Sequence, residues 1–315
     1  MHLLADAAAK LHSTLLDWYA QNRRDLPWRR TRDPYRILVS EIMLQQTQVS
    51  RVVPKLEEWL QLFPTVTALA NATKREVLVA WSGMGYNRRA LNIHRVATEI
   101  QNSYRGEIPA DLESLCALPG IGKYTASAVM CFAFRRKVPV VDINIRRVIS
   151  RVTLLLEHED ELLPETEAWT IAADMLPDRA YFNWNQALMD LGAAVCTKRS
   201  PGCTVCPVSQ FCKSSGNLEP MKIERSSSVR EVPRRIYRGK VIELLRSNNG
   251  RKGYSFEEIG RTLRAGFSEK HHDWLVDILH TLEADEMIIV KRNGRSIMAS
   301  EISLDLASIT VHLVE

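Results

Sequence analysis

Apolar residues recur at helical spacing through most of the first 215 positions. Between 5 and 22 they stand at Leu11, Leu15, Trp18 and Tyr19, which together form one face of a helix. The same pattern, interrupted by turns that contain Gly or Pro, predicts two helices over 35–63 separated near Pro54. It predicts further short helices over 76–81, 89–101, 111–117 and 125–134. Because strand-like alternation is scarce before residue 285, the pattern predicts an all-α body over residues 1–215.

The pattern changes after residue 215. Residues 216–236 contain Ser and Pro with little apolar periodicity, which predicts an extended linker. Basic residues outnumber acidic ones there, so contact with phosphates and a simple solvated linker both remain open.

Residues 237–300 combine helical and strand-like patterns. The dipeptide Asn293-Gly294 between two alternating segments is a strong hairpin signal. The predicted elements are three helices and two strands, over 238–246, 255–263, 269–285, 287–290 and 296–298. This combination indicates a small α/β winged-helix-like domain.

Composition places the chain among ordinary globular proteins, with 45% hydrophobic and 25% charged residues. The formal net charge of +5 is mildly basic and is compatible with a polyanionic partner. No apolar run approaches the ~20 residues that span a bilayer. Asp6, Lys10 and Asp17 interrupt the N-terminal segment, which therefore does not resemble a signal peptide. We expect a cytoplasmic protein without membrane attachment, in which thiols stay reduced.

Four of the six cysteines lie close together near the end of the helical body. They are Cys196, Cys203, Cys206 and Cys212, with the spacing C-x6-C-x2-C-x5-C. Structural zinc sites usually have two close pairs separated by a longer stretch, whereas this loop has one close pair flanked by single cysteines. Four thiolates in one loop suit a [4Fe–4S] cubane, in which each iron takes one sulfur ligand. The spacing favours this cluster over zinc.

The other two cysteines lie inside apolar helical segments. We expect both Cys116 and Cys131 to be small buried side chains, because free cysteine behaves as a small hydrophobic residue.

A glycine-containing turn joins two of the predicted short helices. It runs from Leu118 through Gly120 and Gly122 to Lys123 (LPGIGK). Glycines let the backbone approach a ligand closely, and the N–H groups at the start of the second helix form an anion site. A lone G-x-G turn is a weak signal, but its place between two short helices makes it a helix–hairpin–helix candidate, which contacts the DNA backbone without reading sequence.

Several motifs, occurring in order, resemble one known superfamily. Residues 118–126 (LPGIGKYTA), 141–148 (VDINIRRV) and the cysteine loop are similar to the helix–hairpin–helix DNA glycosylases of the endonuclease III and MutY superfamily. Residues 40–49 (SEIMLQQTQV) resemble the MutY-type adenine DNA glycosylases in particular. So do residues 26–29 (LPWR) and 83–86 (GMGY). The likeness covers residues 10–215.

The resemblance implies a fold, a cofactor and a partner. The expected fold is a six-helix barrel over 24–135 beside an iron–sulfur cluster domain formed by 1–23 and 136–215, with the substrate cleft between them. The expected cofactor is a [4Fe–4S] cluster. The expected partner is double-stranded DNA containing a mispair, bound by a monomer associated with the nucleoid.

The resemblance also implies catalytic residues. The general acid of the family falls on Glu41 and its catalytic aspartate on Asp142, while Tyr124 and Asn144 match further active-site positions. Without the motifs, a Glu on an amphipathic helix is usually solvated and an Asp before a helix is usually an N-cap. Tyr124 has a core-packing alternative.

Two carboxyl groups suit the chemistry of base removal. An N-glycosidic bond breaks with a cationic sugar and an anionic leaving base, as in glycoside hydrolysis. A protonated Glu41 would donate to N7 of adenine, and an ionised Asp142 would stabilise the sugar cation. Endonuclease III-like enzymes have a strand-cleaving lysine where this chain has Tyr124. Lys123 points about 100° away on a helix, so we expect base removal without efficient strand cleavage.

The residues expected to contact DNA fall into three groups. By resemblance, Gln46, Thr47 and Tyr86 enter the helix around the mispair. Lys198 and Arg199 add positive charge beside the cysteine loop. In the C-terminal segment, 269–285 would be a recognition helix and the wing would touch phosphates, unless the domain binds protein or packs on the catalytic body. The basic residues of the wing are Lys291, Arg292 and Arg295.

Two alternatives to an adenine glycosylase stay open. The winged-helix-like segment stands where MutY ends in a Nudix-like domain, and the motifs of residues 118–134 also resemble glycosylases that remove thymine or uracil opposite guanine. A non-catalytic, redox-sensing DNA-binding regulator is the alternative from another class. Glu41 within its MutY-like helix favours adenine opposite guanine or 8-oxoguanine.

Overall fold

The computed structural model describes residues 2–156, 158, 161–218, 232–250, 253–302 and 306–315. The chain divides into two units. Unit 1 contains Met1–Leu38, Ala110–Ala117 and Ile121–Ser226. Unit 2 contains Val39–Pro109, Leu118–Gly120 and Ser227–Glu315, so it includes both the middle helices and the C-terminal domain. Of the predicted linker, residues 219–231 lie outside the described part.

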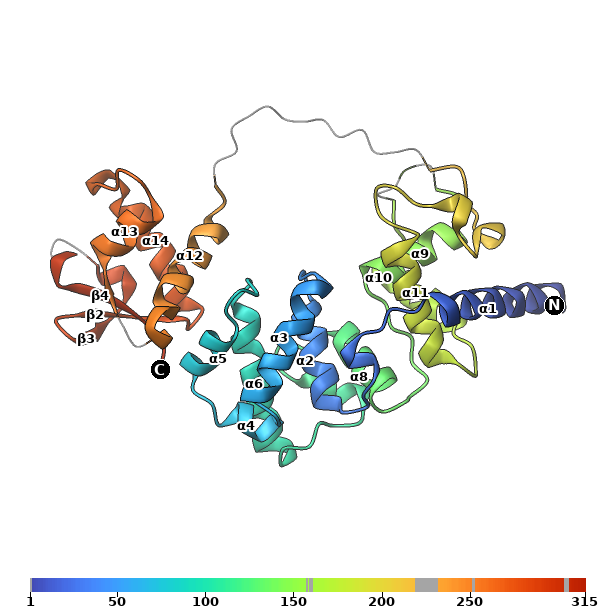
Figure 1. Ribbon diagram of the computed structural model, residues 1–315, viewed down its shortest axis with the longest axis horizontal. Coiled ribbons are helices and arrows are strands. Elements are labelled where there is room, and N and C mark those ends of the chain that lie inside the picture. Colours follow the sequence, from blue (N-terminus) through green and yellow to red (C-terminus); the bar gives the residue numbers. More distant parts are fainter. Residues whose placement is uncertain (1, 157, 159–160, 219–231, 251–252, 303–305) are drawn as a thin grey trace. The chain divides into compact units, whose positions relative to one another are not determined.

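The described part of unit 1 is helical (Figure 1). Its α-helices are α1 (His2–Asn22), α7 (Leu112–Ala117), α8 (Lys123–Phe132), α9 (Ile143–Thr153), α10 (Glu165–Asp174) and α11 (Tyr181–Ala194). Its 3-10 helices are η1 (Pro27–Arg29), η2 (Cys203–Val205) and η3 (Ser209–Phe211). Helix α2 (Pro34–Leu44) begins in unit 1 and ends in unit 2.

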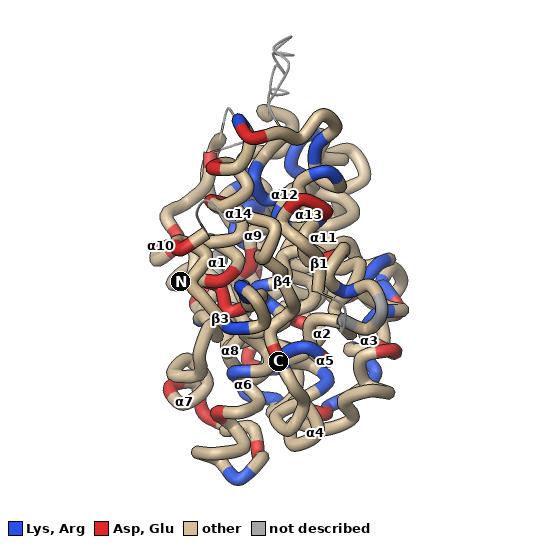
Figure 2. Tube along the Cα trace, turned by 90° about the vertical axis from the view of Figure 1, so that its left-hand side faces the viewer, with Lys and Arg blue, Asp and Glu red and all other residues tan. Residues whose placement is uncertain are grey.

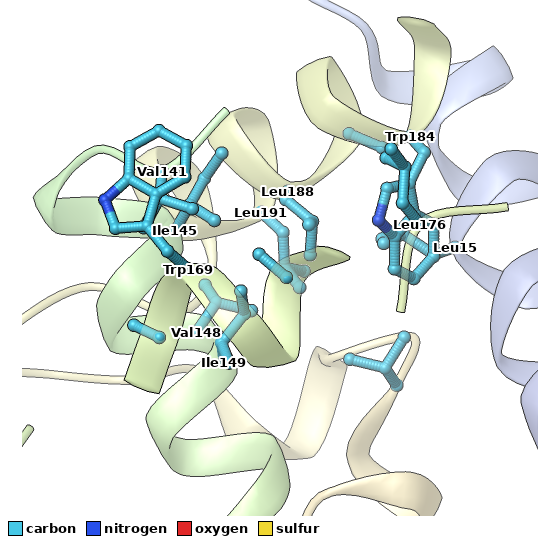
Figure 3. Close-up of a cluster of buried hydrophobic side chains, with 14 of the residues drawn as sticks. Leu15, Val141, Ile145, Val148, Ile149, Trp169, Leu176, Trp184, Leu188 and Leu191 are labelled. Carbon is cyan, nitrogen blue, oxygen red and sulfur yellow. The ribbon is translucent and has the colours of Figure 1, made fainter. Parts of the chain in front are cut away.

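The core of unit 1 is a cluster of buried side chains from α1, α9, α10 and α11 (Figure 3). Ile145, Val148 and Ile149 supply the α9 part, at positions that lie on one face of a helix. Burying each such side chain contributes about 1.5–3 kcal/mol. This face therefore fixes the orientation of α9 and of the residues at its N-terminal end.

A buried ion network connects α11 with residues 24–29 of unit 1. The Asp190 carboxylate on α11 has a side chain only 1% exposed and accepts hydrogen bonds from Arg29 at 2.7 and 2.8 Å and from Arg24 at 2.7 Å. Burial raises the pKa of Asp190, but the hydrogen bond and charge of Arg29 outweigh it and hold the pKa below its ordinary value. The LPWR motif that resembles MutY is thereby tied to α11.

The middle helices of unit 2 are α3 (Val49–Leu62), α4 (Val66–Ala70), α5 (Lys74–Ala80) and α6 (Arg88–Tyr104). Thr73 and Glu76 form a capping box that starts α5. The prediction of a break near Pro54 is wrong, because Pro54 lies inside α3. The chain instead leaves the helix before Val49, where Gln46 has a φ of 57°, outside the helical region.

The C-terminal domain of unit 2 has the predicted three helices and hairpin. They are α12 (Arg234–Arg246), α13 (Phe256–Leu263) and α14 (His272–Ala284), with strands β2 (Ile288–Arg292) and β3 (Arg295–Ile297). The turn residues Asn293 and Gly294 have φ of 49° and 80°, as a type I′ turn requires. Short 3-10 helices complete it: η4 (Ser247–Gly250), η5 (Glu269–His271), η6 (Ala299–Glu301) and η7 (Leu306–Ser308).

The sheet of this domain holds two more strands than the sequence pattern predicts. Its order is β1-β4-β2-β3 with antiparallel pairs, where β1 is Tyr254–Ser255 and β4 is Ile309–Leu313. Strand β4 lies beyond the predicted domain end at residue 300 and pairs along the whole of β2. Its alternate residues Ile309, Val311 and Leu313 are buried.

Candidate active site and metal centre

Asp142 is the N-cap residue of α9 and is half-buried. Its Oδ1 accepts a hydrogen bond of 2.6 Å from the backbone N–H of Ile145, and its Oδ2 accepts one of 3.0 Å from Asn144 Nδ2. The interpretation of Asp142 as an N-cap residue is therefore correct, but the cap uses only one of the two carboxylate oxygens. Asn144 donates to the second oxygen and so orients the carboxylate.

A chain of hydrogen bonds continues from Asn144 to the cysteine loop. Arg147 donates to Asn144 Oδ1 at 3.0 Å, to the Gly192 carbonyl at 2.7 Å and to the Cys196 carbonyl at 2.9 Å. Burial lowers the pKa of Arg147. A Cβ added at Gly192 would lie 3.0 Å from Asn144 Cβ, so α11 approaches α9 as closely as a glycine allows. Asp142 and the cysteine loop thus share one rigid support.

The four loop cysteines line one pocket. Cys196, Cys203, Cys206 and Cys212 surround it together with Arg151 and a few small residues. Burial raises the pKa of the Cys206 thiol to about 11, so metal binding there must displace protons. In the described residues, no group of three or more His, Cys, Asp or Glu forms a site for a metal ion. The residues present nevertheless fit a thiolate-ligated group, because all four cysteines line the same pocket.

Arg151 holds the cysteine loop to α9. Its side chain, almost fully buried, donates to the carbonyls of Thr197 at 2.8 Å and Lys198 at 3.0 Å, and to Cys196 Sγ at 3.4 Å. A guanidinium beside a thiolate offsets part of the negative charge that such a cluster carries. Lys198 and Arg199 themselves are exposed. The sequence analysis did not single out Arg151, although an arginine on the face of an amphipathic helix that meets the cysteine loop is a usable signal.

Tyr124 and Lys123 open α8 in unit 1. Tyr124 is partly buried against the unit 1 core, which is the packing alternative considered above. The ammonium of Lys123 lies 4.3 Å from the centre of the Trp169 ring, within cation–π range. Lys123 therefore has a structural partner on α10.

The hairpin before α8 has the predicted backbone. Gly120 has a φ of 76°, and a Cβ there would lie 3.2 Å from Asn92 Nδ2. Leu118 is buried, whereas Gly122 and Lys123 are exposed. Gly122 is the N-cap of α8 and makes no side-chain cap, so the first N–H groups of the helix lack that partner.

Glu41 belongs to the part of α2 that lies in unit 2. It is 4% exposed and stands between the buried residues Ser40 and Ile42. The interpretation of Glu41 as a solvated helix residue is therefore wrong.

Two of the three residues expected at the mispair, Thr47 and Tyr86, contact the same arginine. Arg89 donates to the carbonyls of Ile42, Met43 and Gln45 at 2.9, 2.9 and 2.5 Å, and to Thr47 Oγ1 at 2.9 Å. Its guanidinium carbon lies 5.5 Å from the centre of the Tyr86 ring. Burial lowers the pKa of Arg89 to about 10. Arg89 thus connects the end of the Glu41 helix with the Tyr86 loop.

Sequence reasoning missed Arg89, although a signal exists. Arg89, Ile93, Val96 and Ile100 are all buried along α6 at helical spacing, so the arginine occupies a position of the apolar face. Gln46 and Tyr86 are exposed and have φ of 57° and 45°. Non-glycine residues in this region cost about 1–3 kcal/mol each and cluster at ligand-binding sites.

The wing and the predicted recognition helix differ in charge. Arg295 is exposed, whereas Lys291 and Arg292 are half-buried and Arg292 donates to the Glu301 carbonyl at 2.7 Å. Helix α14 contains no Lys or Arg.

The two cysteines outside the loop differ in burial. Cys131 is buried as expected. The prediction for Cys116 is wrong, because Leu115 lies on the buried side of α7 and Cys116 is exposed.

The fold and the site together define a base excision DNA repair protein. Residues 39–172 match the HhH-GPD superfamily of base excision DNA repair proteins. A thermostable thymine-DNA glycosylase superposes with a TM-score of 0.62 at 32% identity, covering 67% of this chain and 98% of that one. Endonuclease III trapped on DNA superposes at 0.57 with 22% identity, covering 65% and 93%, and supports the fold alone. The predicted fold class is confirmed.

Curated relatives narrow the class. The chain is 43% identical over 235 residues to the adenine DNA glycosylase of Mycolicibacterium smegmatis, covering 74% of this chain and 80% of the relative. It is 40% identical over 240 residues to that of Mycobacterium tuberculosis, covering 75% and 78%. The human enzyme is 37% identical, with 74% and 44% covered. The chain belongs to the MutY-type family of adenine DNA glycosylases.

No helix in the described residues could cross a membrane.

Proposed function

We propose that the protein is a monofunctional DNA glycosylase that removes adenine mispaired with guanine or 8-oxoguanine. The observation that carries the proposal is the Asp142 carboxylate, held by Ile145 and Asn144 within a motif shared with this family. Relatives named adenine DNA glycosylase at up to 43% identity support the choice of base.

In the proposed mechanism the two carboxyl groups divide the work. Glu41, buried and protonated, donates to N7 of the extruded adenine and makes the base a neutral leaving group. Asp142, ionised and oriented by Asn144, stabilises the positive charge that develops on the sugar, and water then completes hydrolysis. Extrusion of the base costs a few kcal/mol before chemistry begins.

The DNA strand stays intact because this chain has no lysine at the position of the strand-cleaving lysine in endonuclease III-like enzymes. Tyr124 stands there, and Lys123 lies over the Trp169 ring. This contact holds the Lys123 ammonium against α10.

The resident cofactor we propose is a [4Fe–4S] cluster on Cys196, Cys203, Cys206 and Cys212. Four cysteines around one pocket support it, and Arg147 of α9 binds the loop at the Cys196 carbonyl, so the residues that would hold the cluster are connected to Asp142. When bound, the group supplies thiolate cross-links that order the loop. The exposed Lys198 and Arg199 beside it are proposed phosphate contacts.

The proposed partner is mispaired double-stranded DNA, bound by a monomer at the nucleoid. The hairpin residues Leu118, Gly120, Gly122 and Lys123 hold a phosphate with their backbone. Gln46, Thr47 and Tyr86 enter the helix around the mispair, and the exposed Arg295 adds phosphate contact together with Lys291 and Arg292.

A duplex panel tests the proposal. Adenine, thymine or uracil is placed opposite guanine, 8-oxoguanine or cytosine, and base release is measured in single turnovers, with alkali added to half of each sample. We expect adenine release opposite guanine and 8-oxoguanine, with strand breaks only after alkali. Because one similar structure is a thymine-DNA glycosylase, release of thymine without adenine is the outcome that would reverse the assignment.

A further inference from the structure

The C-terminal domain contacts the middle helices of unit 2 through a buried arginine, Arg246, at the end of α12. Its side chain is 4% exposed. It donates to the Leu78 carbonyl at 2.7 Å and to Asn87 Oδ1 at 2.8 Å, and it pairs with Glu243. Glu243 in turn accepts a hydrogen bond of 3.1 Å from Ser82 Oγ. One guanidinium and its carboxylate partner thus bind both ends of the segment from Leu78 to Asn87.

This segment is the loop that carries Tyr86. Gly83, Gly85 and Tyr86 all have positive φ, with values of 81°, 67° and 45°. The two glycines adopt such angles without strain, whereas the positive φ of Tyr86 persists only where its surroundings over-determine it. Arg89 holds the loop from the α2 side, as described above, and Arg246 holds it from the C-terminal domain.

The bond between Arg246 and Asn87 takes the place of a helix-capping bond that Asn87 would ordinarily make. It is the N-cap residue of α6, where an Asn side chain ordinarily accepts from the first turn of its helix. Here it makes no such bond, and its oxygen accepts from Arg246 instead. The start of α6, directly after Tyr86, is therefore oriented by a residue of another domain.

The charges of the C-terminal domain favour docking of the domain on the middle helices over DNA binding by α14. That helix contains no Lys or Arg, and its exposed residues include Asp273 and Asp277, which repel phosphates. The residues just after it face the middle helices. Their ion pairs are Asp285 with Arg88 at 3.3 Å, and Glu286 with Lys74 at 2.6 Å and Arg95 at 3.2 Å. Figure 2 shows Lys and Arg positions in blue beside the labels of α5 and α6.

We propose that the C-terminal domain, through Arg246, positions the Tyr86 loop for entry into mispaired DNA. Arg246 is a positioning residue that acts through Asn87, and the domain contributes to mispair recognition without reading a base itself. The proposal rests on the DNA glycosylase function proposed above.

A double-mutant cycle in the full chain tests the proposal. The variants are Arg246→Met, Asn87→Ala and the double variant, with Arg261→Met as the control, since Arg261 is an exposed arginine of the same domain that pairs only with Glu257 among the described residues. Each protein is titrated with a mispaired and a matched duplex, and 2-aminopurine beside the mispair reports unstacking by the loop. Asn87→Ala leaves the bonds of Arg246 to Leu78 and Glu243 in place, so it tests positioning even if Arg246→Met unfolds.

The expected result is a loss of discrimination with retained binding to matched DNA. Both single variants should lower the preference for the mispaired duplex about tenfold, as the loss of one charged hydrogen bond predicts. The double variant should lose no more than Arg246→Met, and the 2-aminopurine signal should fall in parallel. Unchanged discrimination in Asn87→Ala, or additive losses in the double variant, would overturn the positioning role. These binding readouts do not depend on base release, so a wild-type chain that releases no adenine would overturn the proposed function separately.

Discussion

Asp142 in unit 1 and the mispair loops in unit 2 are held in place in different ways. Asp142 is held by Ile145 and Asn144, which lie three and two residues away in the chain. Thr47 is bound by Arg89, which also reaches Gln45 across 44 positions, and the Tyr86 loop contacts both Arg89 and Arg246, which reaches Asn87 across 159. The reacting group is thus ordered by its own helix terminus, whereas the DNA-contacting loops are ordered by distant side chains. Removing the local support should therefore lower base release, whereas removing the distant side chains should lower binding of the mispair.

The largest effect is expected from Asp142→Asn, which tests the local support. Asn is as good an N-cap as Asp, so the bond to the Ile145 N–H and the start of α9 should survive. The negative charge is lost, and base release should fall by about two orders of magnitude or more. Single-turnover rates measure the loss, and thermal unfolding provides the control. A near-normal rate in a folded variant would remove Asp142 from the mechanism.

Arg89→Met tests the long-range support. It leaves the carbonyls of Ile42, Met43 and Gln45 without their buried donor, and we expect the free energy of unfolding to drop by about 4 kcal/mol. Urea unfolding measures it. The neighbouring Arg88→Met is the matched control, because Arg88 is 69% exposed and its ion pair contributes about 1 kcal/mol at most. Equal losses in the two variants would refute the organising role of Arg89.

Asp190→Asn tests a long-range ion network that supports unit 1, and it should cost about 3 kcal/mol because Arg29 is left without its buried partner. The pKa of Asp190 is lowered in the folded chain, so its contribution is complete above the unfolded pKa and is lost as pH falls through the folded pKa. The wild-type chain should therefore lose this stability only below about pH 4, and the variant should show a flatter acid dependence. Urea unfolding from pH 7 to pH 3 measures both. A variant as stable as the wild type at pH 7 would contradict the role of the network.

The smallest effect is expected from removing the charges of the wing. Lys291→Ala with Arg295→Ala should weaken all duplexes a few-fold and lower the slope of log affinity against log salt by about one to two. Titrations at several salt concentrations measure this. A selective loss for one mispair would instead mean that the wing reads a base.

The sequence predicts the local features well and the long-range ones poorly. The type I′ turn at Asn293-Gly294 and the cap of α9 at Asp142 depend on residues within a few positions, so their patterns are visible in the chain. The pattern predicts a break at Pro54 because proline is a helix breaker, yet the chain turns at Gln46, next to the Gln45 carbonyl that Arg89 binds. The pattern does not predict strand β4, because its partner residues in β2 lie between 17 (Arg292↔Ile309) and 25 (Ile288↔Leu313) positions away. An arginine such as Arg246 gives no sign in the sequence of which domain it will bind.

The close approach of Gly192 to Asn144 has a consequence for how natural variation in this chain should be interpreted. Gly192 carries no functional group, yet a methyl group there would press on the side chain and the backbone carbonyl of Asn144. That residue orients the Asp142 carboxylate, and Arg147 bonds both to it and to the Gly192 carbonyl. We expect an allele with alanine at this position to shift Asn144 by a small amount and so to slow excision more than it weakens the binding of mispairs. In a genetic screen it would resemble the loss of a catalytic carboxylate, although it lies on another helix and changes no charge.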